Sequence, residues 1–359
     1  MTKTVSLWIF ILAAFIVFTT SCSSDDSFTD EIGFEAPPLQ NTNGTNNNTQ
    51  GTRPNGSNGT STGNTNTGET TETNTDNNTN SSSDCTNDNE INTDRTACNT
   101  SLSYSNSVSI TVSGNTRTIT ANNIPDHNIG VAGPNTVSPQ NNTYSINTNP
   151  QVGTNTTALL SNSGPAYSFG ILLNGVEVDP EAAKPWPHTG SMASANWTWN
   201  LEAMHVRIGL DCNNAHVQPN GQYHYHGNPT LLIESMNISN NDMTLIGYAA
   251  DGFPIYFKYG YNNATTSSGG VKTLESSYRL KSGSRPGDGD TAPCGTYDGV
   301  YSNDFEYIEG LGDLDQCNGR VGVTPNYPEG TYYYVITDDF PYIPRCFVGS
   351  PSNDFRIGG

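Results

Sequence analysis

Positive charge is scarce in this sequence: 14 lysines and arginines stand against 34 aspartates and glutamates, and the formal net charge is −20. Proteins hold the phosphates of nucleic acids with lysine and arginine, so this composition argues against a nucleic acid partner. It also argues against direct adsorption of the folded chain to anionic lipids. The sequence does not identify a protein or glycan partner.

The motifs of common enzymes are also absent. The sequence contains no Gly-x-Ser-x-Gly elbow, no phosphate-binding loop, no dinucleotide fingerprint and no His-Glu-x-x-His helix. It contains no Cys-x-x-Cys, so a zinc ribbon or a thioredoxin-like redox site has no support. Nucleophilic and nucleotide chemistry therefore lack a basis in the sequence, and a role without catalysis is favoured.

One apolar run, residues 5–18, points to export. It is too short to span a bilayer comfortably, and it leads through small residues to Cys22. This pattern predicts a lipoprotein signal peptide at residues 1–21 with lipid on Cys22; a plain secretory signal is the alternative. The acidic residues that follow resemble signals of surface-exposed lipoproteins. We therefore expect an outer-membrane lipoprotein exposed at the cell surface, with the lipid as its membrane contact.

Residues 22–84 are mostly Asn, Thr, Gly and Ser. With few apolar side chains to bury, they cannot offset the entropy of folding, so we expect a disordered tether. The remaining residues, 85–359, are long enough for one large domain or two small ones. We expect one disulfide-bonded, β-rich domain there.

Six cysteines remain once Cys22 is assigned to lipid. An even number in an exported chain predicts three disulfides. Cys85 and Cys98 would close a short loop, and we expect them to pair. The other four cysteines allow three pairings that their positions do not separate: Cys212, Cys294, Cys317 and Cys346.

Glycine, proline and tyrosine are frequent (36, 21 and 18 residues), and apolar stretches are short. This composition predicts a mainly β fold, a short-stranded sandwich or barrel-like domain with long loops and few helices. The best helix candidate is 199–208, where Leu201, Met204 and Ile208 have helical spacing. Expected hairpins and strands cover 107–120, 167–178, 245–248, 255–259 and 332–336.

Three of the six histidines lie within eleven residues: His216, His224 and His226. Side chains on a strand recur on one face every second residue, so His224 and His226 point the same way. Proline cannot adopt the positive φ of a tight two-residue hairpin, so 219–221 is expected to form a three-residue loop ending in a glycine bulge. That loop places His216 opposite His224 on the same face.

Three converging imidazoles predict the protein side of a transition metal site, for copper or zinc. Asp251, in an Asp-Gly turn, is a candidate for an additional oxygen ligand, although such residues more often serve the turn itself. The alternative is a histidine and tyrosine ladder that only packs. A second candidate is calcium at the acidic stretch 288–315, where solvated acidic loops are the competing interpretation.

The chain repeats one pattern: Cys-Asn followed by Pro-x-Gly-x-Tyr-x-Tyr occurs at 212–225 and again at 317–334. Tyr333 stands in the second copy where His224 stands in the first, so metal chemistry is assigned to the first copy. We expect two related hairpins that pack against each other; the alternative is that the two stretches share only their turn chemistry.

The stretches 213–227, 247–256 and 312–320, with Phe340-Pro341-Tyr342 and Cys346, resemble the YHYH domain family over residues of about 160–350. The resemblance implies one exported β-rich domain and no particular activity. It also implies that Cys317 pairs with Cys346, which leaves Cys212 for Cys294.

Three functions follow from these features. The first is a lipid-anchored surface domain that holds copper or zinc through the three histidines. The second is a metal-dependent hydrolase or oxidase that uses the same ion to activate water, with Asp251 moving protons. The third is a structural or adhesive surface protein with calcium in its acidic loops.

Overall fold

The computed structural model describes residues 91–188, 194–206 and 208–357. All of them belong to one unit that spans 76–359. The expected signal peptide (1–21), the lipidation site Cys22, the tether (22–84) and Cys85 lie outside the described residues. Within the described ranges, no helix is long and apolar enough to cross a membrane.

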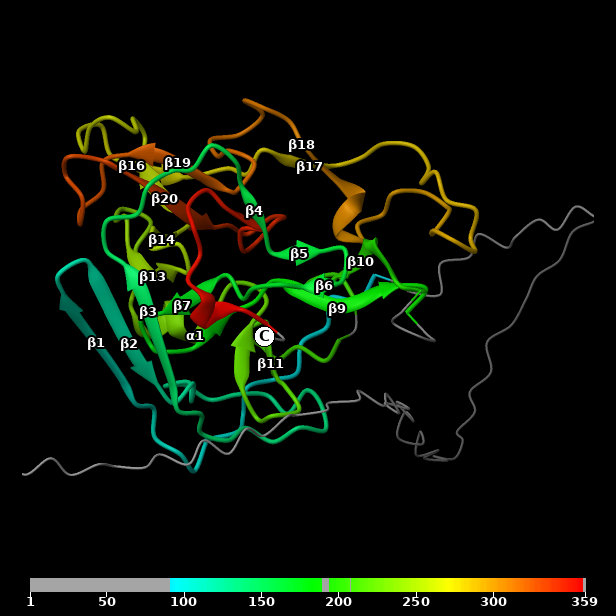
Figure 1. The fold of residues 1–359 in the computed structure, drawn as a ribbon, viewed down its shortest axis with the longest axis horizontal. Coiled ribbons are helices and arrows are strands. Elements are labelled where there is room, and N and C mark those ends of the chain that lie inside the picture. Colours follow the sequence, from blue (N-terminus) through cyan, green and yellow to red (C-terminus); the bar gives the residue numbers. More distant parts are fainter. Residues whose placement is uncertain (1–90, 189–193, 207, 358–359) are drawn as a thin grey trace, which may run out of the picture. The chain divides into compact units, whose positions relative to one another are not determined.

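The fold is mainly β, as predicted, and the described strands form several sheets and no closed barrel (Figure 1). The largest sheet has eight strands in the order β11-β12-β8-β7-β13-β14-β20-β19. Its strands are β7 (Gly170–Leu172), β8 (Glu177–Val178), β11 (Ala215–Val217), β12 (Tyr223–Tyr225), β13 (Leu245–Ala249), β14 (Pro254–Phe257), β19 (Gly319–Gly322) and β20 (Thr331–Ile336).

This sheet is built from two copies of one four-stranded unit. In the first copy, the hairpin β7–β8 is followed by the hairpin β11–β12, and β12 runs parallel to β8. In the second, β13–β14 is followed by β19–β20, and β20 runs parallel to β14. The copies join where β7 pairs with β13. The repeated hairpins therefore lie at opposite edges of the sheet, and the expectation that they pack together is wrong.

An aspartate side chain stabilises the turn that precedes each repeated hairpin. Asp211 Oδ1 accepts a hydrogen bond from the backbone two residues on at 2.8 Å, and Asp315 Oδ1 does the same at 2.9 Å. Each carboxylate also accepts a hydrogen bond from a tyrosine hydroxyl of its own hairpin. Tyr223 donates to Asp211 at 2.8 Å, and Tyr332 donates to Asp315 at 3.1 Å. Aspartate is suited to this role because its short side chain can bond the backbone of its own turn.

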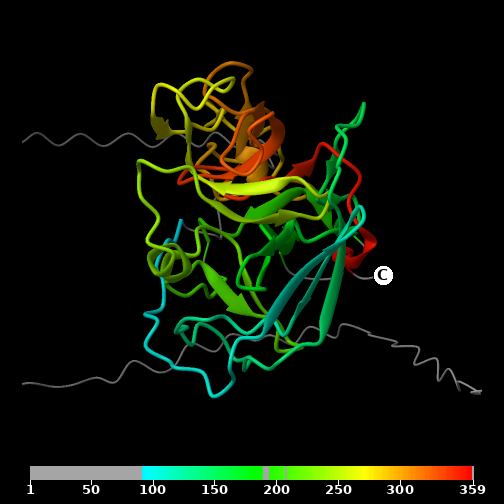
Figure 2. The same ribbon diagram turned by 90° about the vertical axis from the view of Figure 1, so that its left-hand side faces the viewer.

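Smaller sheets and short helices surround the large sheet. Figure 2 shows the three long strands β1, β2 and β3 side by side. The remaining elements are β1 (Val108–Ser113), β2 (Thr116–Ala121), β3 (Asn142–Asn147), β4 (Thr157–Ala158), β5 (Leu160–Ser161), β6 (Gly164–Pro165), β9 (Glu181–Trp186), β10 (Asn196–Glu202), α1 (Thr230–Ser235), β15 (Tyr259–Tyr261), β16 (Val271–Thr273), β17 (Tyr278–Leu280), η2 (Ser302–Asp304), β18 (Phe305–Tyr307), β21 (Cys346–Phe347) and η3 (Asn353–Phe355).

The predicted hairpins at 107–120 and 167–178 are confirmed, since β1 pairs with β2 and β7 with β8. The helix expected at 199–208 is wrong, because β10 occupies its beginning and pairs with β9. Trp197, Trp199 and Leu201 are all less than 10% exposed. This period of two matches a strand, whereas the helical interpretation relied on Met204 and Ile208 beyond its end.

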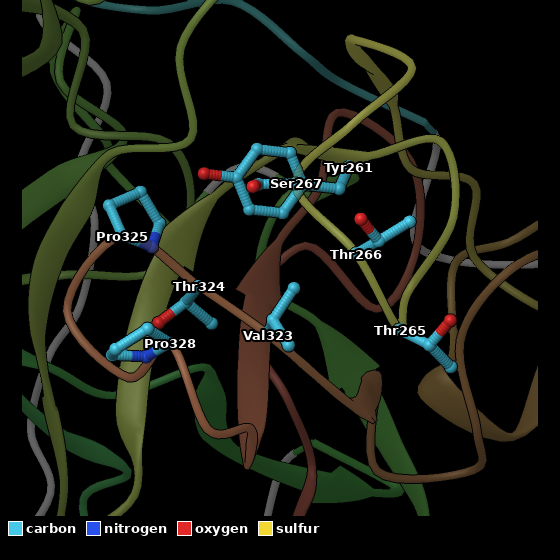
Figure 3. Close-up of a pocket in the computed structure, with 8 residues that line it drawn as sticks. All are labelled: Tyr261, Thr265, Thr266, Ser267, Val323, Thr324, Pro325 and Pro328. Atoms are coloured by element: carbon cyan, nitrogen blue, oxygen red, sulfur yellow. The ribbon is translucent and has the colours of Figure 1, made fainter.

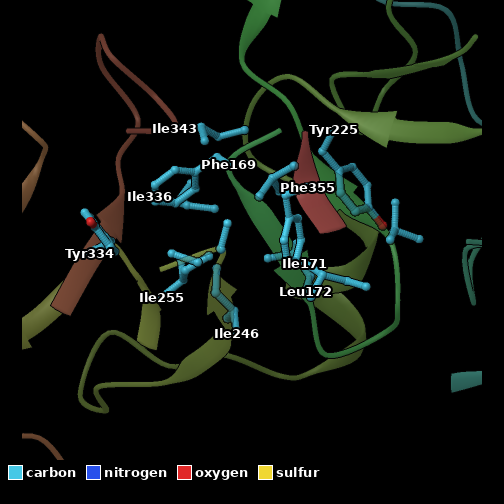
Figure 4. Packing of buried hydrophobic residues seen from close by; sticks show 14 of the residues in the cluster. Phe169, Ile171, Leu172, Tyr225, Ile246, Ile255, Tyr334, Ile336, Ile343 and Phe355 are labelled. Carbon is cyan, nitrogen blue, oxygen red and sulfur yellow. The ribbon is translucent and has the colours of Figure 1, made fainter. Parts of the chain in front are cut away.

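The core lies on the large sheet and combines residues of both copies. Figure 4 shows Phe169, Ile171 and Leu172 of the first copy beside Ile246, Ile255 and Ile336 of the second. Phe169 is fully buried, with its ring edge-to-face against Tyr334 at 4.9 Å and stacked on Phe347 at 5.4 Å. This packing fixes the strands from which both edge hairpins project.

Two disulfides join segments far apart in the sequence: Cys98 with Cys212, and Cys317 with Cys346. The second confirms the pairing implied by the family resemblance. The first shows that the expected pairs Cys85–Cys98 and Cys212–Cys294 are wrong; Cys294 is disulfide-bonded as well. The cause is a backbone bridge between Thr96 and Asp211, which brings the N-terminal segment alongside the first repeated hairpin. Disulfides are typical of proteins outside the cytoplasm.

Candidate metal centre

The β11–β12 hairpin has the predicted register, with His216 opposite His224. Its loop has three residues, since Gln218 and Gln222 close it through a 2.8 Å backbone hydrogen bond. Gly221 has φ of +86°, and a Cβ there would lie 2.0 Å from Ser138 Oγ, so only glycine fits. The sequence argument from the proline is confirmed.

The three imidazoles converge through their Nε2 atoms. Nε2 of His226 lies 2.9 Å from Nε2 of His224 and 3.2 Å from Nε2 of His216. The ring planes are inclined by 64° to 84°, so the rings meet edge to face rather than stacking. Nδ1 of His216 donates to the carbonyl of Ile208 at 3.2 Å, which leaves its Nε2 lone pair free to bind.

These distances fit a bound transition metal ion. Tetrahedral zinc with bonds of 2.0 to 2.1 Å separates its nitrogen ligands by about 3.3 Å. The two separations from Nε2 of His226 differ from this value by a few tenths of an ångström, and the ligand atoms of all three histidines lie within 4.8 Å of one another. Among the described residues, these histidines form the one group of three or more His, Cys, Asp or Glu side chains with metal-ligand spacing.

Burial keeps the histidines neutral. His224 and His226 are each 2% exposed, and His216 is partly buried. Burial lowers the pKa of His216, and it lowers the pKa of the other two well below the ordinary value, with the neighbouring imidazoles adding to the effect. Neutral imidazole is the form that binds metal.

These pKa shifts predict a pH dependence of stability. The unfolded chain takes up protons on histidine as the pH falls through about 6.5, whereas folded His224 and His226 remain neutral. The stability is therefore complete above this pH and decreases below it. We expect the free energy of unfolding of the metal-free protein, measured in urea from pH 8 to 5, to fall less steeply in the double variant His224→Gln, His226→Gln. Parallel curves would contradict this assignment.

Asp251 is not among the converging ligands. Its Oδ2 accepts the hydroxyl of Tyr334 at 2.6 Å and the backbone NH of Gly349 at 2.9 Å. Burial raises its pKa to about 6. Asp251 lies between β13 and β14 in the second copy, where it ties the β20 tyrosine to the C-terminal segment.

The other histidines have structural contacts. His127 Nε2 is 2.7 Å from the hydroxyl of Tyr225, on the face opposite the histidine group. His205 contacts the hydroxyl of Tyr342 and the carbonyl of Gly299.

The acidic stretch 288–315 is engaged in internal contacts. Asp304 pairs with Arg285, Glu306 with Arg279 and Asp313 with Lys272. The exposed Asp288 accepts backbone hydrogen bonds within its own loop. No calcium-type group of carboxylates is found in the part of the chain that the structure describes.

A separate pocket of about 400 Å³ lies on the second copy (Figure 3). Its lining contains no histidine, cysteine or carboxylate, so this pocket offers no metal ligands of the kind that the β11–β12 hairpin carries. The lining residues are Tyr261, Thr265, Thr266, Ser267, Val323, Thr324, Pro325 and Pro328.

The sequence did not reveal a buried charged cluster near His226. Arg345 makes two 2.9 Å hydrogen bonds to Glu202 and one of 3.0 Å to the carbonyl of Pro180. Glu181 lies 3.4 Å from the same guanidinium. More than 140 residues separate Arg345 from its partners, and no spacing pattern marks such a cluster.

The fold and site define a class: a β-rich, disulfide-bonded domain with a buried three-histidine group on an edge hairpin. The chain belongs to the YHYH protein family, whose model matches residues 143–349, more than half of the sequence. The letters of the family name are Tyr223, His224, Tyr225 and His226 here, so they include two of the three converging histidines. No curated protein and no solved structure matches the chain.

Proposed function

We propose that this protein is a lipid-anchored cell-surface domain that binds one copper or zinc ion through Nε2 of His216, His224 and His226. The observation that carries the proposal is the approach of three imidazole Nε2 atoms, from two buried histidines and the partly buried His216, to 2.9 and 3.2 Å. Nδ1 of His216 donates to the carbonyl of Ile208, so its Nε2 carries a lone pair toward the other two rings, and a cation bound to all three Nε2 atoms would join them. Imidazole ligands suit copper and zinc.

Burial favours holding the ion over catalysis. His224 and His226 are each 2% exposed, so the ion would be reached from the side of His216. The carboxylate proposed to move protons in a hydrolase, Asp251, is held by Tyr334 and Gly349 instead. Binding therefore has more support than hydrolysis or oxidation.

The lipid anchor on Cys22 is part of the proposal. The disulfides support a location outside the cytoplasm, and the signal-like run before Cys22 supports lipidation. Labelling of cells with radioactive palmitate, compared between the native chain and Cys22→Ala, tests the anchor.

Elemental analysis tests the metal site. We expect protein purified without a histidine tag, and dialysed against buffer with equimolar copper and zinc, to retain one transition metal ion per chain. The ion should be displaced by acid, since protonated imidazole cannot bind metal. Retention of no copper or zinc would mean that the histidines only pack.

A further inference from the structure

The buried side chain of Asp179 directly follows β8, the strand that pairs with the histidine strand β12. β12 runs parallel to β8, with His224 opposite Glu177. The ladder continues beyond the end of β8, since the backbone NH of Asp179 donates to the carbonyl of Tyr225 at 2.8 Å. Neighbouring residues across a sheet share a face, so Asp179 is placed on the face of His224 and His226.

Arg345 contacts the segment that carries Asp179. Its Nη1 donates to the carbonyl of Pro180, directly after Asp179. Burial has the largest influence on the pKa of Asp179 and raises it, whereas the positive charge of Arg345 lowers it. Arg345 is therefore hydrogen-bonded to the residue directly after the point where Asp179 pairs with the histidine strand.

The positive charge of Arg345 does not balance the acids around it. Glu202 takes two of its hydrogen bonds, and Glu181 lies within 3.4 Å. Asp179 is 6% exposed, and no ion pair to it occurs within the described ranges. The buried side chains thus comprise three carboxylates and one guanidinium, an excess of two negative charges when all are ionised.

Without a nearby cation, the excess negative charge makes ionisation of these buried carboxyl groups unfavourable. Burial, followed by the charges of Glu177 and Glu181, raises the pKa of Asp179 to about 8. A divalent cation held by three neutral imidazoles would bring two positive charges into this environment. Its charge would offset the two excess negative charges of this buried group, and the partly buried Glu177 adds a further negative charge beside it.

We propose that Asp179, supported by Glu181, makes the histidine site selective for divalent over monovalent metal ions. This inference rests on the proposed function, because it concerns the ion that the three histidines hold. It distinguishes Zn²⁺ and Cu²⁺ from Cu⁺, which imidazole ligands alone would also accept. Asp179 acts as a counter-charge and not as a ligand.

The dependence of Coulomb energy on ion charge gives a quantitative test. An electrostatic contribution to binding is proportional to the charge of the ion, so it is twice as large for Zn²⁺ as for Ag⁺, a stable substitute for Cu⁺. Removing the Asp179 charge should therefore reduce Zn²⁺ affinity by a larger factor than Ag⁺ affinity. A neighbour outside the ligand set typically changes metal affinity by about 10- to 100-fold.

The experiment measures Zn²⁺ and Ag⁺ dissociation constants at pH 8 by chelator competition for the native protein, Asp179→Asn and Asp251→Asn. Asparagine keeps the size of the side chain and its acceptor oxygen. We expect Asp179→Asn to weaken Zn²⁺ binding by about 10- to 100-fold and Ag⁺ binding by about 3- to 10-fold. Asp251→Asn, another buried aspartate, should change neither.

The outcomes separate the two proposals. If the native protein binds neither ion, the proposed function fails. If the native protein binds both ions and Asp179→Asn weakens them equally, Asp179 has only a structural role and the selectivity proposal is overturned. Unchanged Zn²⁺ affinity in a folded Asp179→Asn variant, checked by circular dichroism, would overturn it too, and Glu181→Gln provides a second variant for the same comparison.

Discussion

Tight binding of copper or zinc should be lost in His224→Ala and in His226→Ala. Each substitution removes one of three nitrogen ligands and leaves two, so we expect the affinity to fall by more than about 100-fold, beyond the usual effect of a neighbour outside the ligand set. Titration calorimetry on protein without a histidine tag measures the change.

Two substitutions serve as controls for this experiment. His127→Ala removes a histidine that contacts Tyr225 on the opposite face of the hairpin. Tyr333→Ala changes the residue of the second repeated hairpin that corresponds to His224. Both should retain the native affinity. If His224→Ala binds with native affinity and stoichiometry, the three-histidine site is refuted.

The largest loss of stability is expected from Arg285→Ala. The side chains of Arg285 and Asp304 are fully buried and form an ion pair in which Arg285 Nη2 lies 2.6 Å from Asp304 Oδ2. Removing the guanidinium leaves a buried carboxylate with only neutral donors, the backbone NH groups of Gly299 and Tyr301. Loss of one partner of a buried pair costs about 3 to 5 kcal/mol. Urea denaturation measures this free energy.

A surface ion pair is the matched control. Arg279 pairs with Glu306 at 2.9 Å, but both side chains are more than one third exposed. Arg279→Ala should lower the free energy of unfolding by less than about 1 kcal/mol, because water screens the pair. Equal losses in the two arginine variants would show that burial does not determine the strength of the Arg285 pair.

The histidine site was predictable because its geometry is local. Proline at position 219 restricts the loop to three residues, the loop sets the register, and the register places His216 opposite His224. Strand periodicity then adds His226 to the same face. Each step depends on neighbours within eleven residues, where covalent geometry limits the alternatives.

Features that depend on distant contacts were not predictable. The Cys98–Cys212 disulfide spans 114 residues and follows from the pairing of Thr96 with Asp211. Asp179 is brought beside the histidine strand by a parallel pairing between β8 and β12, which the sequence does not encode in any short pattern. The alternation of Trp197, Trp199 and Leu201 indicates the strand β10, but Leu201, Met204 and Ile208 also have helical spacing. The sequence pattern alone does not decide between the two.

The duplicated hairpin shows that this architecture does not depend on histidine. At the other edge of the sheet, Arg320 lies opposite Tyr333 in the same register, and Val335 makes the backbone bond that His226 makes in the first copy. The same turn and strands thus form around an arginine, a tyrosine and a valine. The hairpin would therefore fold without an ion bound to the histidines, in contrast to zinc fingers, which unfold when their metal is removed. The protein could therefore load and release metal while it remains folded.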